Sequence, residues 1–266
     1  MLRVVIGGLM IIFAFVQADG QQLLTDLIHT SAPQKTETIT RRVDAFVTRL
    51  AGKRESHTEK EFLQLIFAEA HRRHFKTYKP YTRFSEVFDK GRYDCLSATS
   101  FLAVVLQAFE YDFHIVETNY HIFISVQTSS GPVLLESTDR LNGFVEDVDQ
   151  IQERITSYRQ NKLQAADGNK VYHQFDLNLY QVVKPHQLSG LLLFNQAIVA
   201  FNNRDLADSA EKLKRAVQIY DSPRTSEFAA ILITAIIHSS IHDEIKKELI
   251  SPFSKYLHSS NTVAAR

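Results

Sequence analysis

Residues 91–140, GRYDCLSATSFLAVVLQAFEYDFHIVETNYHIFISVQTSSGPVLLESTDR, decide the fold of this chain of 266 residues. The stretch opens on a turn that ends at the chain's single cysteine, Cys95, and continues into a helical pattern of apolar residues. Strand-like runs follow; one carries His121, and the next ends at Glu136, with Asp139 three residues further on. A cysteine, a histidine and an acid on consecutive elements is the order expected of a thiol nucleophile, its base and the group that orients the base.

The pattern after Cys95 predicts a helix followed by a small antiparallel sheet. Apolar side chains recur at helical spacing over residues 96–109, as in a central helix that packs on most of its sides. A helix packed on such a sheet belongs to the α+β class. The strand-like runs are 111–116, 120–127 and 132–136, with a hairpin turn at 128–131.

Strand register decides which acid lies beside His121. A loop of even length, centred between Ser129 and Ser130, pairs apolar residues with apolar residues across the hairpin. The same register places Glu136 on the face of His121, one diagonal step away. A loop of odd length would favour Asp139 instead, so Glu136 is the preferred third residue and Asp139 the alternative. The pairs in the even register are Val126 with Val133 and Ile124 with Leu135.

Each of these residues suits one role in thiol chemistry. Cysteine reacts as the thiolate, which the dipole and free N–H groups of a helix N-terminus stabilise, and Cys95 stands at such a position. His121 would pair with the thiolate and protonate a leaving amine, while Glu136 would hold the imidazole in one tautomer. The N–H of Cys95 is a natural oxyanion donor, with Tyr93 or Tyr81 as candidates for the second.

Three short motifs occur in order: Gly-x-x-Asp-Cys at 91–95, Tyr-His-Ile-Phe at 120–123 and Leu-Leu-Glu-Ser-Thr at 134–138. Their order and spacing resemble the transglutaminase-like superfamily of papain-like fold, over residues 62–145. Where that family has Asp-Pro-Thr, this chain has Glu-Ser-Thr. The resemblance implies acyl transfer from an amide through a thioester. Because the family includes crosslinkers, peptidases, amidases and deamidases, both hydrolysis and transamidation stay open.

The N-terminal residues 1–18 have the pattern of a signal peptide. Arg3 precedes an apolar run over residues 4–16, and Val16-Gln17-Ala18 suits a signal-peptidase site. The run is shorter than the ~20 residues of a membrane span, and no other stretch approaches that length. We therefore expect export, to the periplasm or out of the cell, and no membrane span after cleavage; an uncleaved anchor is the alternative.

Charge and composition limit the expected partners. With 30 basic and 30 acidic residues the net charge is +0, which gives no electrostatic footprint for nucleic acid. His71 and His74 lie three residues apart, but Arg72 and Arg73 between them favour a solvated basic face over a metal site. We expect no metal, no cofactor, and a peptide or protein as the substrate.

Two domains are expected after the leader. Residues 19–184 would form the α+β domain and residues 185–266 a helical region. Within it, residues 187–220 resemble a tetratricopeptide helix pair, and residues 227–256 a second pair. Such pairs usually present a surface to peptides or proteins, which makes a protein partner one expectation; a helical cap on the first domain is the other.

The sequence supports three hypotheses of function, in decreasing order of preference. The first is an exported cysteine hydrolase or acyltransferase that acts on peptide or protein amides. The second is a non-catalytic binding protein that keeps the fold, while its helical region recruits a partner. The third is a mostly helical scaffold in which Cys95 is a buried core residue.

Overall fold

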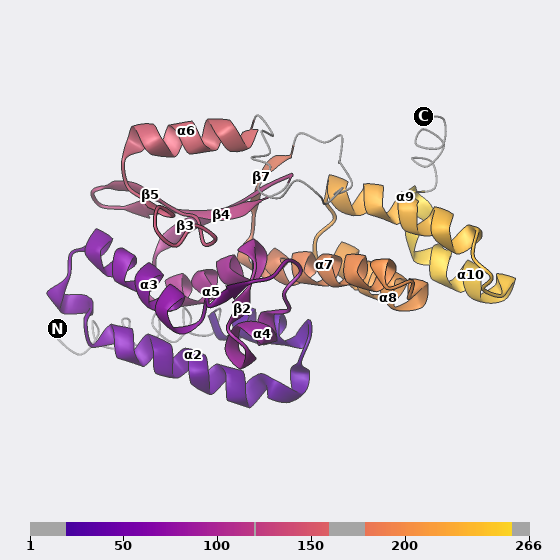
Figure 1. The fold of residues 1–266 in the computed structure, drawn as a ribbon, viewed down its shortest axis with the longest axis horizontal. Coiled ribbons are helices and arrows are strands. Elements are labelled where there is room, and N and C mark those ends of the chain that lie inside the picture. Colours follow the sequence, from indigo (N-terminus) through magenta and orange to yellow (C-terminus); the bar gives the residue numbers. More distant parts are fainter. Residues whose placement is uncertain (1–19, 120, 160–178, 257–266) are drawn as a thin grey trace, which may run out of the picture. The chain divides into compact units, whose positions relative to one another are not determined.

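A computed structural model of the chain describes residues 20–119, 121–159 and 179–256 (Figure 1). These residues form two compact units, one of residues 20–119, 121–159 and 179–188 and the other of residues 189–256. The predicted signal peptide at 1–18 lies outside the described ranges. Within those ranges, no helix combines the length and the apolar character that a lipid bilayer requires of a spanning helix.

The first unit is built around an antiparallel sheet with the strand order β6-β5-β4-β3-β7. The predicted hairpin register is confirmed, because Ile124 lies opposite Leu135 and Val126 opposite Val133. Helices packed on this small sheet place the unit in the predicted α+β class. The strands are β3 (Asp112–Thr118), β4 (Ile122–Thr128), β5 (Gly131–Leu135), β6 (Phe144–Val145) and β7 (Tyr180–Val183), with a separate parallel pair, β1 (Thr77–Tyr78) and β2 (Arg92–Tyr93).

Helix α5 (Cys95–Ala108) is the central helix that the sequence predicted. Every residue from Leu96 to Leu106 is buried, as expected of a helix that is apolar on all sides. It packs on the sheet, where the Thr99 hydroxyl donates a hydrogen bond to the carbonyl of Ile122, at 3.5 Å. The other helices of this layer are a segment at 20–29, η1 (Pro33–Lys35), α2 (Thr36–Ala51), η2 (Arg54–Ser56), α3 (Glu59–Arg73) and α4 (Phe84–Asp89).

Helix α6 (Val148–Arg159) covers the face of the sheet opposite α5 (Figure 1). Its residues Ile151 and Ile155 pack with Phe123 and Leu134 from the strands. Both faces of β4 are therefore buried, and Phe123 is 0% exposed although it alternates with the residues that face α5. The sheet lies between two helical layers.

The prediction of a solvated basic face at His71 and His74 is wrong. His71 is 2% exposed, and its ring lies 4.6 Å from that of Phe67 and 5.2 Å from that of Phe75. The ring of His74 lies 4.8 Å from that of Phe101. Burial, with a smaller contribution from nearby arginines, lowers the pKa of each histidine to about 4. Both rings are neutral members of an aromatic core.

The described part of the second unit is helical. Its first helix pair follows the prediction, and the Ser209 hydroxyl on the second helix donates to the carbonyl of Ala197 on the first, at 2.9 Å. A core that includes Leu213, Phe228 and Phe253 joins this pair to the next helices. The elements are η3 (Pro185–Gln187), which precedes the unit, α7 (Leu188–Asn202), α8 (Leu206–Ile219), α9 (Pro223–Ile237), α10 (Asp243–Ile250) and η4 (Ser251–Tyr256).

Replacing both core histidines by phenylalanine (His71→Phe with His74→Phe) should make the fold less sensitive to acid. In the folded chain the two rings stay neutral down to a pKa of about 4, whereas in the unfolded chain they take up protons near pH 6.5. Wild-type stability therefore falls as the pH drops from 6.5 towards 4, by up to about 1.4 kcal/mol per pH unit for each histidine. Urea unfolding at several pH values should show a shallower loss for the variant, and equal slopes would contradict neutral burial.

Candidate active site

Cys95 is the first residue of α5, and hydrogen bonds on both sides fix its position. The Asp94 carboxylate caps the helix by accepting bonds from the amide and hydroxyl of Ser97, at 2.8 and 2.7 Å, and from the amide of Thr82, at 3.0 Å. Burial raises the pKa of Asp94, while these hydrogen bonds act in the opposite direction. Cys95 is a part-exposed residue at a capped helix start, where the first N–H groups have no acceptor within the helix.

His121 lies in the turn between β3 and β4, one residue before β4 begins. The turn is closed by hydrogen bonds from the Thr118 amide to the His121 carbonyl, at 2.8 Å, and from the His121 amide to the Thr118 hydroxyl, at 3.1 Å. The imidazole is thereby held at the end of the sheet where α5 begins, and its side chain is 18% exposed.

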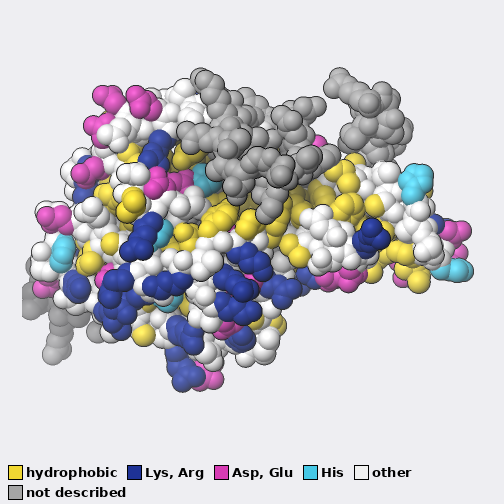
Figure 2. All heavy atoms as spheres, viewed as in Figure 1, with side chains coloured by type: hydrophobic (Ala, Val, Ile, Leu, Met, Phe, Trp, Pro, Cys, Tyr) yellow, Lys and Arg dark blue, Asp and Glu magenta, His cyan; other side chains and the backbone are white. Residues whose placement is uncertain are grey.

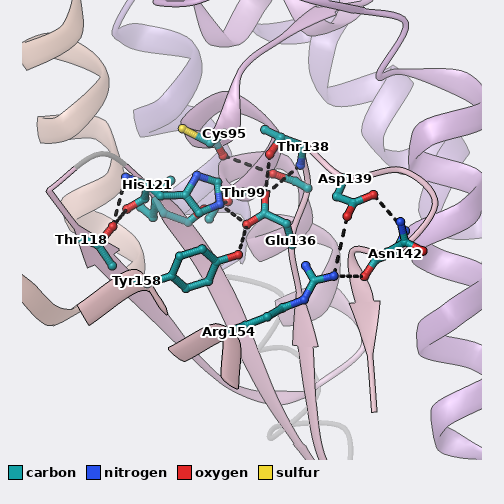
Figure 3. A network of polar contacts seen from close by, with 12 residues as sticks. Cys95, Thr99, Thr118, His121, Glu136, Thr138, Asp139, Asn142, Arg154 and Tyr158 are labelled. Atoms are coloured by element: carbon teal, nitrogen blue, oxygen red, sulfur yellow. Dashed lines mark hydrogen bonds and ion pairs between the residues drawn. The ribbon is translucent and has the colours of Figure 1, made fainter. Parts of the chain in front are cut away.

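Glu136 follows β5 and receives four hydrogen-bond donors (Figure 3). One carboxylate oxygen contacts Nε2 of His121 and also accepts from the Tyr158 hydroxyl, at 3.0 Å. The other accepts from the amide and hydroxyl of Thr138, at 3.0 and 2.6 Å. The backbone is fixed as well, because the Glu136 amide donates to the carbonyl of Gly143, at 2.7 Å.

The electrostatics favour a charged pair. Burial by itself lowers the pKa of His121, but the nearby Glu136 carboxylate and Cys95 outweigh it, so the pKa is raised on balance. Burial alone would raise the pKa of Glu136, yet the charge of His121 and the donors on both oxygens lower it. The favoured state is an imidazolium beside a carboxylate.

The thiol and the imidazole lie together. Figure 3 shows the Cys95 side chain near the ring of His121, and Cys95 is one of the groups that raise the pKa of the histidine. Since Nε2 faces Glu136, Nδ1 is the ring nitrogen left for the thiol. The Ser137 hydroxyl donates to the Cys95 carbonyl, at 3.4 Å, and so ties the helix start to the segment after β5.

Asp139, the alternative third residue, is engaged elsewhere. One of its carboxylate oxygens accepts from the amides of Leu141 and Asn142, at 3.2 and 2.9 Å. The other lies 3.6 Å from the guanidinium of Arg154. The structure thus brings Cys95, His121 and Glu136 together and leaves Asp139 in the loop that follows.

The two tyrosines considered as oxyanion donors differ in setting. Tyr93 is 8% exposed, and its ring stacks on Phe75 at 5.1 Å. Tyr81 has a φ of 58° in a loop whose next amide, that of Thr82, binds Asp94. A side chain in this left-handed region is strained, and such strain is concentrated at functional sites.

Sequence reasoning missed Tyr158 and Arg154 of α6. The Tyr158 ring lies 5.4 Å from that of His121 and 5.1 Å from that of Phe123, so it covers the histidine–glutamate pair. Burial and the nearby Glu136 charge raise the pKa of Tyr158, which keeps it a donor. The spacing of Ile151, Ile155 and Tyr158 marks one face of a helix and would have indicated which side packs on the sheet.

Within the described ranges, no three His, Cys, Asp or Glu side chains converge in a group that could hold a metal ion. The donors around Glu136 are N–H and O–H groups, which bind the carboxylate and occupy the positions that a cation would need. The chemistry of this site is that of a thiol, an imidazole and a carboxylate.

Tyr158→Phe should raise the pKa of Glu136, because it removes one donor to the charged carboxylate and keeps the ring. A hydrogen bond to a charged group contributes about 1.5–3 kcal/mol, which corresponds to a shift of about one to two pH units. Titration of the side-chain carboxyl ¹³C signal by NMR measures it. Tyr180→Phe is the matched control, since its ring contact is with Arg159. If Glu136 has the same pKa in both variants, Tyr158 does not stabilise its carboxylate as assigned.

Gly143→Ala should displace the segment that carries Glu136. A methyl group at this position would collide with the carbonyl oxygens of Glu136 and Asp139, which are backbone atoms held by their own hydrogen bonds. We expect the free energy of unfolding to fall by about 2–3 kcal/mol. Gly52→Ala, where no atom lies within 4 Å of the added carbon, should change it by no more than about 0.5 kcal/mol in denaturant unfolding. Similar losses in both variants would contradict the close approach.

No protein-family model, curated protein or solved structure matches this chain. Its function is therefore inferred from the chemistry of the site.

Proposed function

We propose that the first unit is a cysteine hydrolase or acyltransferase of transglutaminase-like type, acting on peptide or protein amides through a thioester. The observation that carries the proposal is the contact of the His121 ring with the Glu136 carboxylate, at the end of the sheet where Cys95 also lies (Figure 3). A thiol-bearing helix packed against a sheet that carries the base also supports a papain-like arrangement. Export of the protein stays a prediction from residues 1–18.

The first half-reaction forms the acyl-enzyme. The Cys95 thiolate attacks the carbonyl carbon of the amide, a C–S bond forms, and the carbonyl electrons move to oxygen. The N–H of Cys95, at the helix start, is the donor placed to stabilise this oxyanion. Collapse then breaks the C–N bond, and the proton on His121 passes to the leaving nitrogen, which departs as an amine.

The second half-reaction restores the thiol. Water, or an amine in a transamidation, gives a proton to His121 and attacks the thioester carbonyl. The C–S bond breaks, and the thiolate returns to its place beside the imidazolium. Throughout, Glu136 keeps Nε2 of the ring engaged, so that Nδ1 faces the reacting atoms. Because the pKa of His121 is raised, its protonated form is the favoured resting state, and this form donates to the leaving amine.

Alkylation of Cys95 by iodoacetamide at neutral pH tests the assignment of the base. In the wild type the reaction should be fast, and His121→Ala should slow it by about 100-fold, the lower limit expected for loss of a positioned base. His114→Ala is the matched control, because His114 is an exposed histidine on β3. Glu136→Gln should slow the reaction less than His121→Ala does, since it leaves the ring in place.

Trapping the acyl-enzyme then separates an enzyme from a binding protein. Incubation with peptide amides followed by denaturing mass spectrometry should find an acyl adduct on Cys95 that is absent in Cys95→Ser. A thiol that reacts only after unfolding would overturn the proposal in favour of a core cysteine. A fast thiol that never forms an adduct would favour a non-catalytic binding protein.

A further inference from the structure

Lys and Arg residues are concentrated in the segment that leads to the start of α5. Figure 2 shows Lys and Arg side chains gathered over the helical layer of the first unit, although the whole chain has a net charge of +0. We define the basic rim as the cations that lie between the end of α3 and Cys95, together with the first cation after Glu136. Its members are Arg72, Arg73, Lys76, Lys79, Arg83, Lys90, Arg92 and Arg140.

The acids near the basic rim do not neutralise it. Glu69 pairs with two arginines, and Glu86 with an arginine and a lysine, so each carboxylate offsets one charge of two. Lys79, Arg83 and Arg140 form no ion pair within the described residues. The pairs are Arg72 and Arg73 with Glu69, Arg92 and Lys90 with Glu86, and Lys35 with Asp89.

Backbone hydrogen bonds hold the Lys79 backbone against the strand that precedes Cys95. The Lys79 amide donates to the carbonyl of Tyr93, two residues before Cys95, at 2.8 Å. Its carbonyl accepts from the hydroxyl of Thr82, at 2.6 Å, and the amide of Thr82 donates to the Asp94 carboxylate. The charge of Arg140 opposes the effect of burial on the pKa of Tyr93, so Arg140 also lies near this strand.

The carboxylates of Asp94 and Glu136 are buried and are not presented to a ligand. Asp94 is 3% exposed and its oxygens are taken by Ser97 and Thr82, while Glu136 is paired with His121. Exposed acids lie on both sides of the sheet: Glu37, Asp44, Glu55 and Glu61 belong to the helical layer of α2 and α3. A group of three lies at the start of α6, which covers the opposite face of the sheet (Figure 1). They are Glu146, Asp147 and Asp149.

We infer that the site takes acidic peptide segments, in which carboxylates flank the reacting amide on the side of the basic rim. This inference rests on the proposed function, since the reacting group is an amide. Guanidinium groups match carboxylates in shape and charge, and a cleft lined by one sign of charge concentrates ligands of the opposite sign. A peptide provides the amide and the carboxylates together, whereas a nucleic acid provides only the negative charge.

Two alkylating reagents that differ in charge measure the electrostatic field at the thiol, and the measurement needs no enzymatic turnover. The measured quantity is the rate with anionic iodoacetate divided by the rate with neutral iodoacetamide. At low salt this ratio should be about 5-fold or more higher for Cys95 than for glutathione, and the difference should fade at about 0.5 M salt. Lys79→Gln with Arg140→Gln should lower this preference at least 2-fold. Arg49→Gln with Lys53→Gln, which removes two exposed cations of the α2 end, is the charge-matched control and should leave it unchanged. A preference equal to that of glutathione would overturn the inference.

Binding of fluorescent peptides to Cys95→Ser tests the ligand class directly. We expect an Asp- and Glu-rich peptide to bind at least 10-fold more tightly than a Lys-rich one, and the Lys79/Arg140 double variant to lose at least 5-fold of that affinity. Tighter binding of a single-stranded oligonucleotide of equal charge would overturn the peptide assignment. If acidic peptides bind but never acylate Cys95, the charge inference holds and the proposed function fails. Rapid acylation with no preference for acidic peptides would support the proposed function and overturn the charge inference.

Discussion

The buried contact between His121 and Glu136 is the constraint on which the rest of the site depends. Taking two charges out of water costs several kcal/mol per ion unless each finds partners. Glu136 meets this cost with donors on both oxygens, from Thr138, Tyr158 and His121 itself. The loop that ends at Gly143 and the helix α6 are therefore part of the site, although neither carries the thiol or the imidazole.

The sequence predicted the parts of this arrangement that follow from local pattern. Alternation in β4 and β5 fixed the register, because a shift of one residue would have moved Val126 and Val133 off their shared face. That register in turn placed Glu136 within reach of His121. The turn that ends at Cys95 and the apolar helical pattern after it placed Cys95 at a helix start. Catalysis by these residues is a proposal that rests on their geometry.

What the sequence did not predict depends on contacts between distant segments. His71 and His74 were assigned to solvent because charged neighbours surround them in the chain, yet on a helix the neighbours of a residue lie three and four positions away. His71 faces Phe67 and Phe75, whereas Arg72 turns towards Glu69. Tyr158 was overlooked for a similar reason, since nothing local shows that a charged helix will pack on the second face of a sheet.

Glutamate at position 136 explains why so many groups converge on it. Its side chain has one more rotatable bond than aspartate, so holding it in a single orientation costs more conformational entropy. A carboxylate that moved among rotamers would leave the His121 ring free to turn away from the thiol. Thr138 fixes one oxygen and Tyr158 the other, and both bonds come from donors that are themselves anchored, one by the backbone and one by the packing of α6. The longer acid thus needs the second helical layer, and this requirement connects the composition of α6 to the orientation of the imidazole.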